Sequence, residues 1–143
     1  MRVSQGRVGR VFVVRLDDSD RLPQAIEDLA LEKGISAASV ILLGGIGKGR
    51  VVVGPKTPAL PPDPMVAELD SVHEIAAVGT IFANAAGQPK LHMHAALGRD
   101  GRTITGCTRT GLEVWLVAEA IITEITDTSA KRVLEEGLEL LQP

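Results

Sequence analysis

The sequence has almost no aromatic residues and only one cysteine. Aromatic side chains make up 2% of the 143 residues, namely Phe12, Phe82 and Trp115, and there is no tyrosine. Proteins that bind single-stranded nucleic acid stack its bases on several exposed rings, so this class of function is disfavoured. A single cysteine, Cys107, excludes an intramolecular disulfide. It suits a reducing compartment, and we therefore expect a cytoplasmic protein.

Long apolar runs and an excess of positive charge are also missing. No apolar run reaches the roughly 20 residues of a membrane helix, and residues 1–6 do not begin a signal peptide. The 15 Lys and Arg residues against 18 Asp and Glu residues give a formal net charge of −3, which argues against binding nucleic acid by general electrostatics. Hydrophobic residues make up 45% of the chain. This fraction and the length predict one folded domain over residues 1–143.

Short segments of β-branched and apolar residues make up much of the sequence. They predict strands over residues 9–16, 39–43, 50–53, 73–83, 91–97, 103–105 and 113–125, with a weaker one over 65–69. One helix is expected between a polar break at 17–20 and Gly34, because Leu22, Ile26, Leu29 and Ala30 share a helical face. Composition favours a second helix over 130–141, against which Gly137 counts. The fold class is therefore α+β, a mainly antiparallel sheet flanked by one or two helices.

Glycines interrupt the apolar run that follows residue 39. Gly44, Gly45 and Gly47 are typical either of a β-bulge or of a phosphate-binding loop. The phosphate loop requires a GxxxxGK[S/T] pattern followed by a helix, and neither is present. We therefore expect a bulge or a tight β connection.

The three histidines are the strongest chemical signal. His92 and His94 are two residues apart on a predicted strand, so both imidazoles point to the same face and can bind a transition metal such as zinc. His73, at the start of the preceding strand, is the candidate third ligand. Counted in residues, His73 is about twice as far from the turn at 84–89 as His94 is. Simple hairpin pairing therefore does not place His73 opposite His94. The alternative is that these are ordinary histidines bonded to the backbone.

Other polar residues near the histidines have two interpretations each. Cys107 is either a small buried apolar residue or an additional metal ligand. Glu119 has apolar neighbours, and a buried glutamate must be paired or protonated, so it is a structural anchor or an acid/base group. Arg99 and Arg109 flank the turns around the histidines and can bind a carboxylate or phosphate, or they can be solvated.

Three segments carry a family resemblance: HEIAAVGTIF (73–82), GQPKLHMHAALGRDGRTITGC (87–107) and TGLEVWLVAEAIITEI (110–125). They resemble the plants and prokaryotes conserved domain, called PPC or DUF296. The resemblance implies a largely antiparallel sheet, a homotrimer and a histidine-rich metal site, for zinc, near a subunit interface. Many members carry a third histidine after paired glycines, where this chain has Gly106-Cys107-Thr108. We expect His73 to replace it, as in members with a His-Glu-Ile strand.

Two functional hypotheses follow. The first is a trimeric protein that binds zinc through His73, His92 and His94 and holds a small anionic ligand. An open position on such a zinc suits hydrolase or lyase chemistry, and the sequence assigns no reaction. The second is a DNA-binding or regulatory module, as in plant members that join this domain to an AT-hook. The Arg-Gly-Arg-Pro core of that hook is absent, so we expect no DNA binding by this domain alone.

Overall fold

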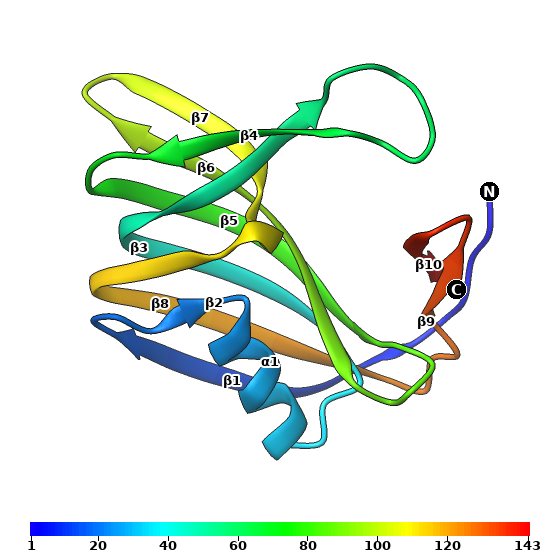
Figure 1. Cartoon of the computed structure of the whole chain (residues 1–143). Helices are drawn as coiled ribbons and strands as arrows, with labels where there is room; N and C mark the ends of the chain where they lie inside the picture. Colours follow the sequence, from blue (N-terminus) through cyan, green and yellow to red (C-terminus); the bar gives the residue numbers. More distant parts are fainter.

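An antiparallel sheet of long strands makes up most of the computed structural model, which describes residues 1–143 (Figure 1). Its strand order is β1 (Arg7–Asp17), β8 (Leu112–Thr126), β3 (Ala37–Pro55), β5 (His73–Ala83), β6 (Pro89–Arg99) and β7 (Arg102–Cys107). Two short strands extend it: β2 (Arg21–Leu22) pairs with β8, and β4 (Pro64–Leu69) pairs with β3. The predicted antiparallel sheet is confirmed.

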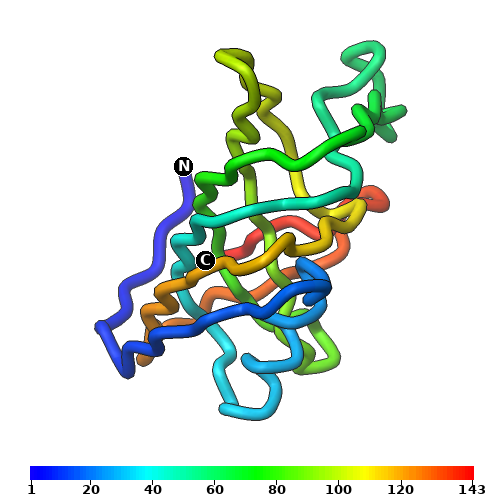
Figure 2. The backbone as a smooth tube through the Cα atoms, turned by 90° about the vertical axis from the view of Figure 1, so that its left-hand side faces the viewer, coloured from blue at the N-terminus to red at the C-terminus, as the bar shows by residue number.

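Strand β3 is continuous through its glycines and bends the sheet. Its first part pairs with β5 and β8, and its last part pairs with β4 and, at Val52, with Cys107 of β7. Figure 2 shows β6 and β7 running at a steep angle to the other strands. Gly44 has φ +140°, and a Cβ there would lie 2.5 Å from the Cα of Ala118. The register shifts on both sides of Ile46 confirm the bulge, and no helix follows that a phosphate loop would need.

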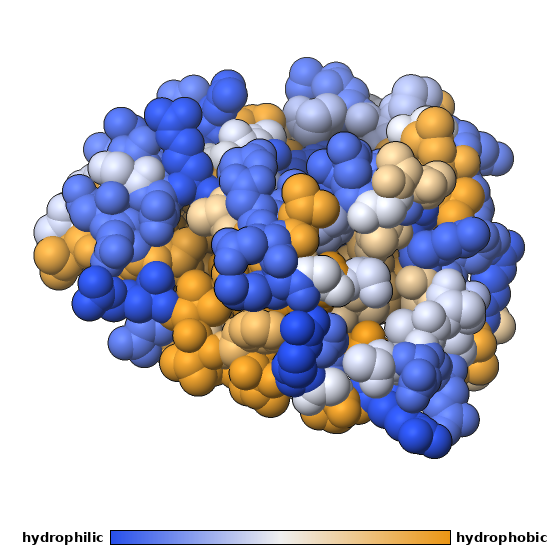
Figure 3. Space-filling view, turned by 90° about the horizontal axis from the view of Figure 1, so that it is seen from below, coloured by the Kyte–Doolittle hydropathy of each residue, from blue (hydrophilic) through white to orange (hydrophobic).

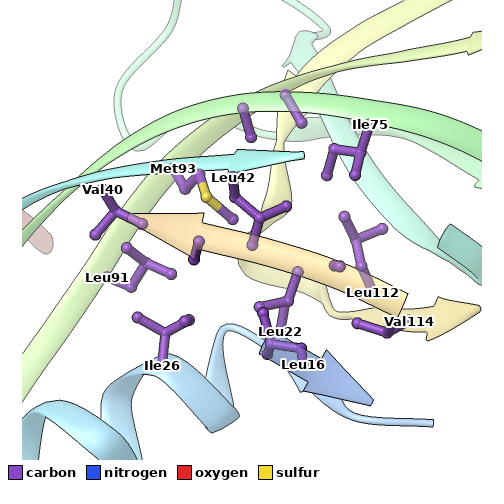
Figure 4. Close-up of a cluster of buried hydrophobic side chains, with 14 of the residues drawn as sticks. Leu16, Leu22, Ile26, Val40, Leu42, Ile75, Leu91, Met93, Leu112 and Val114 are labelled. Atoms are coloured by element: carbon purple, nitrogen blue, oxygen red, sulfur yellow. The ribbon is translucent and has the colours of Figure 1, made fainter. Parts of the chain in front are cut away.

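The core lies between one face of the sheet and helix α1 (Gln24–Glu32) (Figure 4). Ile26 and Ala30 are fully buried on the helix face that the sequence predicted. Pro23 occupies the N-cap position, so the helix begins later than the polar break at 17–20 predicts, and Leu22 lies in β2 instead. The helix ends before Gly34, whose φ of +64° suits glycine.

The predicted second helix over 130–141 is wrong, because this segment forms a β-hairpin. Strand β9 (Lys131–Glu135) pairs with β10 (Leu138–Gln142) across a two-residue turn. Glu136 and Gly137 both have positive φ, 50° and 80°, as a tight hairpin turn requires. Gly137, which counted against the helix, is therefore the residue that the turn needs.

The face of the sheet that points away from α1, here called the outer face, is apolar and uncovered. One register row crosses it through Val13, Ile121, Ile41, Val78 and His94, and the first four are exposed. Figure 3 shows apolar side chains gathered along one side of the molecule seen from below. Soluble monomers rarely expose a continuous apolar patch of this kind. No helix in this structure has the length and apolar character needed to cross a membrane.

An ion pair between Arg10 and Glu124 ties the edge strand β1 to β8. Arg10 donates from Nε to Oε2 (2.8 Å), from Nη2 to Oε1 (2.6 Å) and from its backbone N–H to Oε2 (3.1 Å). These hydrogen bonds lower the pKa of Glu124 to about 2. A carboxylate whose pKa is depressed in the folded state stabilises the fold above its unfolded pKa and loses this effect as the pH falls.

We therefore expect Glu124→Gln to be less stable than the wild type at pH 7. The difference should shrink as the pH falls from about 5 toward 2, where the wild-type carboxylate itself becomes protonated. Urea unfolding at several pH values measures this. Glu135→Gln, whose ion pair with Arg2 is long at 3.6 Å, is the control and should change little. A constant difference between Glu124→Gln and wild type across this pH range would contradict the assignment.

Candidate metal centre

The pairing of β6 with β7 brings together two histidines and the cysteine. His94 lies directly opposite Cys107 in the antiparallel register, so their side chains share a face. His92, two residues earlier on β6, points to that same face. Cys107 is also paired with Val52 of β3, where the bent sheet closes on itself. The site therefore lies at the end of the outer-face row that begins at Val13.

The three donor atoms lie within 4.8 Å of one another. The Nε2 atoms of His92 and His94 are 3.2 Å apart, and their rings meet edge to face at 72°. Two imidazole nitrogens on one tetrahedral zinc are expected at about 3.3 Å, given Zn–N bonds near 2.0 Å. Two histidines and one thiol also form a donor set that zinc accepts. The residues present therefore fit a zinc ion without large movement.

A cavity of about 340 Å³ opens beside this cluster. It is lined by the two histidines, Cys107 and Arg109, and by three prolines: Pro55 at the end of β3, Pro62 in the following loop and Pro64 at the start of β4. The three prolines contribute backbone of restricted φ to the lining. The cavity leaves room for a small molecule next to a bound ion.

Burial and nearby positive charges favour the neutral, metal-binding form of His92. Burial lowers its pKa, and the positive charges of Arg132, His94 and Arg109 lower it further. A neutral imidazole at neutral pH offers a lone pair without first losing a proton. Metal binding at pH 7 therefore competes less with protonation at His92.

His73, the predicted third ligand, does not join this cluster within one chain. Val78, not His73, lies opposite His94, so His73 is five residues away along β5, or about 17 Å. It also points to the core side, where its Nδ1 lies 2.7 Å from the carbonyl oxygen of Ser71. The β5–β6 register has no bulge that would bring it closer. In one chain His73 is the backbone-bonded histidine of the alternative interpretation.

Two other predicted residues lie elsewhere. Glu119 is exposed on the outer face, opposite Leu43 and Arg15, because its apolar neighbours belong to an uncovered surface and not to the core. It is therefore not a buried acid/base group. Arg99 donates to the carbonyl of Val72 and lies near His73, away from the metal cluster. Arg109 does lie beside His92 and His94.

One charged residue near the site was missed by sequence reasoning. Arg132 of β9 is 6% exposed and faces a second cavity that His92 also lines. The segment around it was expected to be a helix, so its proximity to His92 was not foreseen. Two basic residues, Lys131 and Arg132, between Ala130 and Val133 are the only signal, and they do not indicate a site.

Comparison with known proteins identifies one matching family model and several solved structures with a similar fold. The Plants and Prokaryotes Conserved (PCC) domain model matches residues 3–126. A metal-containing protein from Archaeoglobus fulgidus has a similar structure, with 26% identity, a TM-score of 0.87 and coverage of 100% of both chains. A plant- and prokaryote-conserved protein from Pyrococcus horikoshii has 22% identity and a TM-score of 0.85, covering 100% of this chain and 98% of its own.

A candidate DNA-binding protein from Ralstonia eutropha is a more distant structural neighbour. It has 18% identity and a TM-score of 0.76, and the alignment covers 92% of this chain and 90% of that protein. At this identity the likeness is one of fold. A search of curated proteins finds no match.

Proposed function

The chain belongs to the Plants and Prokaryotes Conserved domain family, and from that premise we propose that it is a homotrimeric zinc-binding protein that also holds a small anionic ligand. The ligand set is His92, His94 and Cys107. The observation that carries the proposal is the 3.2 Å separation of the two Nε2 atoms, with the Cys107 thiol on the same face. The structural neighbour from A. fulgidus, a metal-containing protein, supports it.

In this proposal Cys107 is the third zinc ligand, the role that the family resemblance suggested for His73. In the family pattern a histidine follows paired glycines, and this chain has a cysteine directly after Gly106. A thiolate is a strong zinc ligand, so the exchange of histidine for cysteine keeps a three-donor site. The proposal therefore needs no residue from outside β6 and β7.

Three protein ligands leave one coordination position for water or a ligand. A zinc ion in such a site supplies a Lewis acid. His92 and His94 would hold the ion from one strand, and Pro55, Pro62 and Pro64 line the 340 Å³ cavity beside it. Arg109, at the same cavity, offers a cation that can orient an anionic group. This arrangement suits hydrolase or lyase chemistry on a small anionic molecule.

Metal analysis tests the proposal directly. Protein purified without added metal is expected to hold about one zinc per chain, and His94→Ala is expected to hold less than about one-tenth. His73→Asn is the matched control, because its amide can replace the hydrogen bond to Ser71, and it should keep its zinc. A wild-type protein with less than about one-tenth metal per chain would refute the zinc site.

DNA binding is the competing function. The net charge of −3 and the missing AT-hook core do not favour it. A fluorescence titration with duplex DNA at low salt separates the two, and we expect no saturable binding. Saturable binding that weakens steeply with salt would favour the regulatory alternative.

A further inference from the structure

A buried arginine without a partner lies beside the metal cluster. Arg132 of β9 is 6% exposed, and it forms no hydrogen bond or ion pair in the chain. Its Nη2 is the only buried side-chain nitrogen or oxygen without a hydrogen-bond partner. Burying a guanidinium without a partner is costly, and native structures rarely do it unless something else supplies the acceptor.

Arg132 lines a cavity of about 510 Å³ between the C-terminal hairpin and β6. His92 and Arg109 line both this cavity and the one at the metal cluster, so the two spaces adjoin. Leu91, Leu138 and Leu140 add apolar side chains to the wall. A cavity lined by both cationic and apolar side chains matches a small molecule that has an anionic group and an apolar part.

The carboxylates in the cavity do not neutralise Arg132. Glu27 is already engaged, since its Oε1 accepts the backbone N–H of Leu91 (2.9 Å) and its Oε2 lies 3.4 Å from Nζ of Lys90. Glu139 of β10 lies near Arg132 without forming an ion pair. Arg132 therefore keeps at least one buried donor, its Nη2, without an acceptor in the chain.

We propose that Arg132 and Arg109 bind the carboxylate or phosphate group of a small organic anion in the cavity between the C-terminal hairpin and β6. The planar guanidinium of Arg132 can donate two parallel hydrogen bonds to a pair of oxygen atoms. The apolar wall favours an organic anion over inorganic phosphate. This inference deepens the proposed function, on which it rests only in placing the anion next to the zinc.

Titration calorimetry on metal-free protein in chloride buffer tests the anion site. The probes are butyrate, butyl phosphate and inorganic phosphate, which separate the type of headgroup from the apolar tail. We expect saturable binding of butyrate or butyl phosphate, tighter than that of inorganic phosphate. Arg132→Gln should weaken this binding about tenfold or more, because a hydrogen-bonded charge is lost.

Glu139→Gln gives a variant with the opposite expected effect. Removing a carboxylate near the cavity should tighten anion binding by about twofold to fivefold. If Glu139 were instead the true partner of Arg132, this variant would unfold at a lower temperature and bind the probes no better. That result would overturn the inference.

These experiments test the zinc site and the anion site independently. His94→Ala should lose zinc and still bind the organic anion in the metal-free titration. Wild-type protein that binds zinc but none of the probes, or probe binding unchanged in Arg132→Gln, overturns the anion site. Tighter binding of inorganic phosphate than of both organic probes overturns the organic ligand class.

Discussion

Replacing Cys107 with serine is expected to weaken zinc binding by about a hundredfold or more. Substituting a residue that hydrogen-bonds to a metal ligand weakens metal binding by about tenfold to a hundredfold. Loss of the ligand itself should weaken binding at least as much. Competition with a chelator of known zinc affinity measures the change. Cys107→His should recover most of the affinity, because it restores the histidine that follows the glycines in the family pattern.

Cobalt makes the thiolate visible in the same variants. Co²⁺ bound to wild-type protein should show an intense near-ultraviolet absorption from cysteine sulfur, and both Cys107→Ser and Cys107→His should lack it. Thr105→Ser, on the same face of β7, is the control and should leave affinity and spectrum unchanged. A cobalt spectrum without the sulfur absorption in the wild type would show that Cys107 is a packing residue. Zinc would then have only the two histidines from this chain.

The sequence predicts two of the three ligands of this candidate site but not the third. His92 and His94 could be paired because two residues on one strand always share a face. Cys107 could not be chosen over His73, since that choice depends on the register of β6 with its two neighbours. The register places Val78 and Cys107 on either side of His94. No local pattern specifies a pairing between strands.

Most strands and the helix could be predicted from the sequence, but the C-terminal hairpin and the exposure of Glu119 could not. The strands of the main sheet follow from β-branched runs, and α1 follows from its apolar period. The C-terminal segment has helix-forming residues, yet the turn at Glu136 and Gly137 makes it a hairpin. Glu119 was misplaced because apolar neighbours indicate burial only where the sheet face is covered. The position of Glu119 is thus decided by its environment, whereas at the C-terminus a local turn at Gly137 outweighs helix-forming composition.

Dissociation of the proposed trimer is the second large effect that we expect, and substitutions on the outer face should cause it. Val13 is 83% exposed and Ile41 is 57% exposed in the single chain. If copies of the chain cover this face, Val13→Asp with Ile41→Asp introduces two charges per chain into each interface. At a cost of at least about 2 kcal/mol per buried charge, association should weaken about a thousandfold.

Sedimentation velocity at micromolar concentration measures the oligomeric state. We expect trimers for the wild type and monomers for the double variant. Leu31→Asp is the control, because Leu31 is 63% exposed on α1 and away from the outer face. It should stay trimeric. A double variant that sediments like the wild type would mean that the outer face is not where the copies meet.

The same monomers decide whether the metal site is complete in one chain. Val13 and Ile41 lie in the outer-face row but on β1 and β3, so neither is next to His94 on β6. Because His92, His94 and Cys107 all come from one chain, monomers of the double variant should keep about one zinc each. Monomers that lose zinc while remaining folded would show that a neighbouring copy supplies a ligand. His73, which is too far away within its own chain, would then be the residue to substitute next.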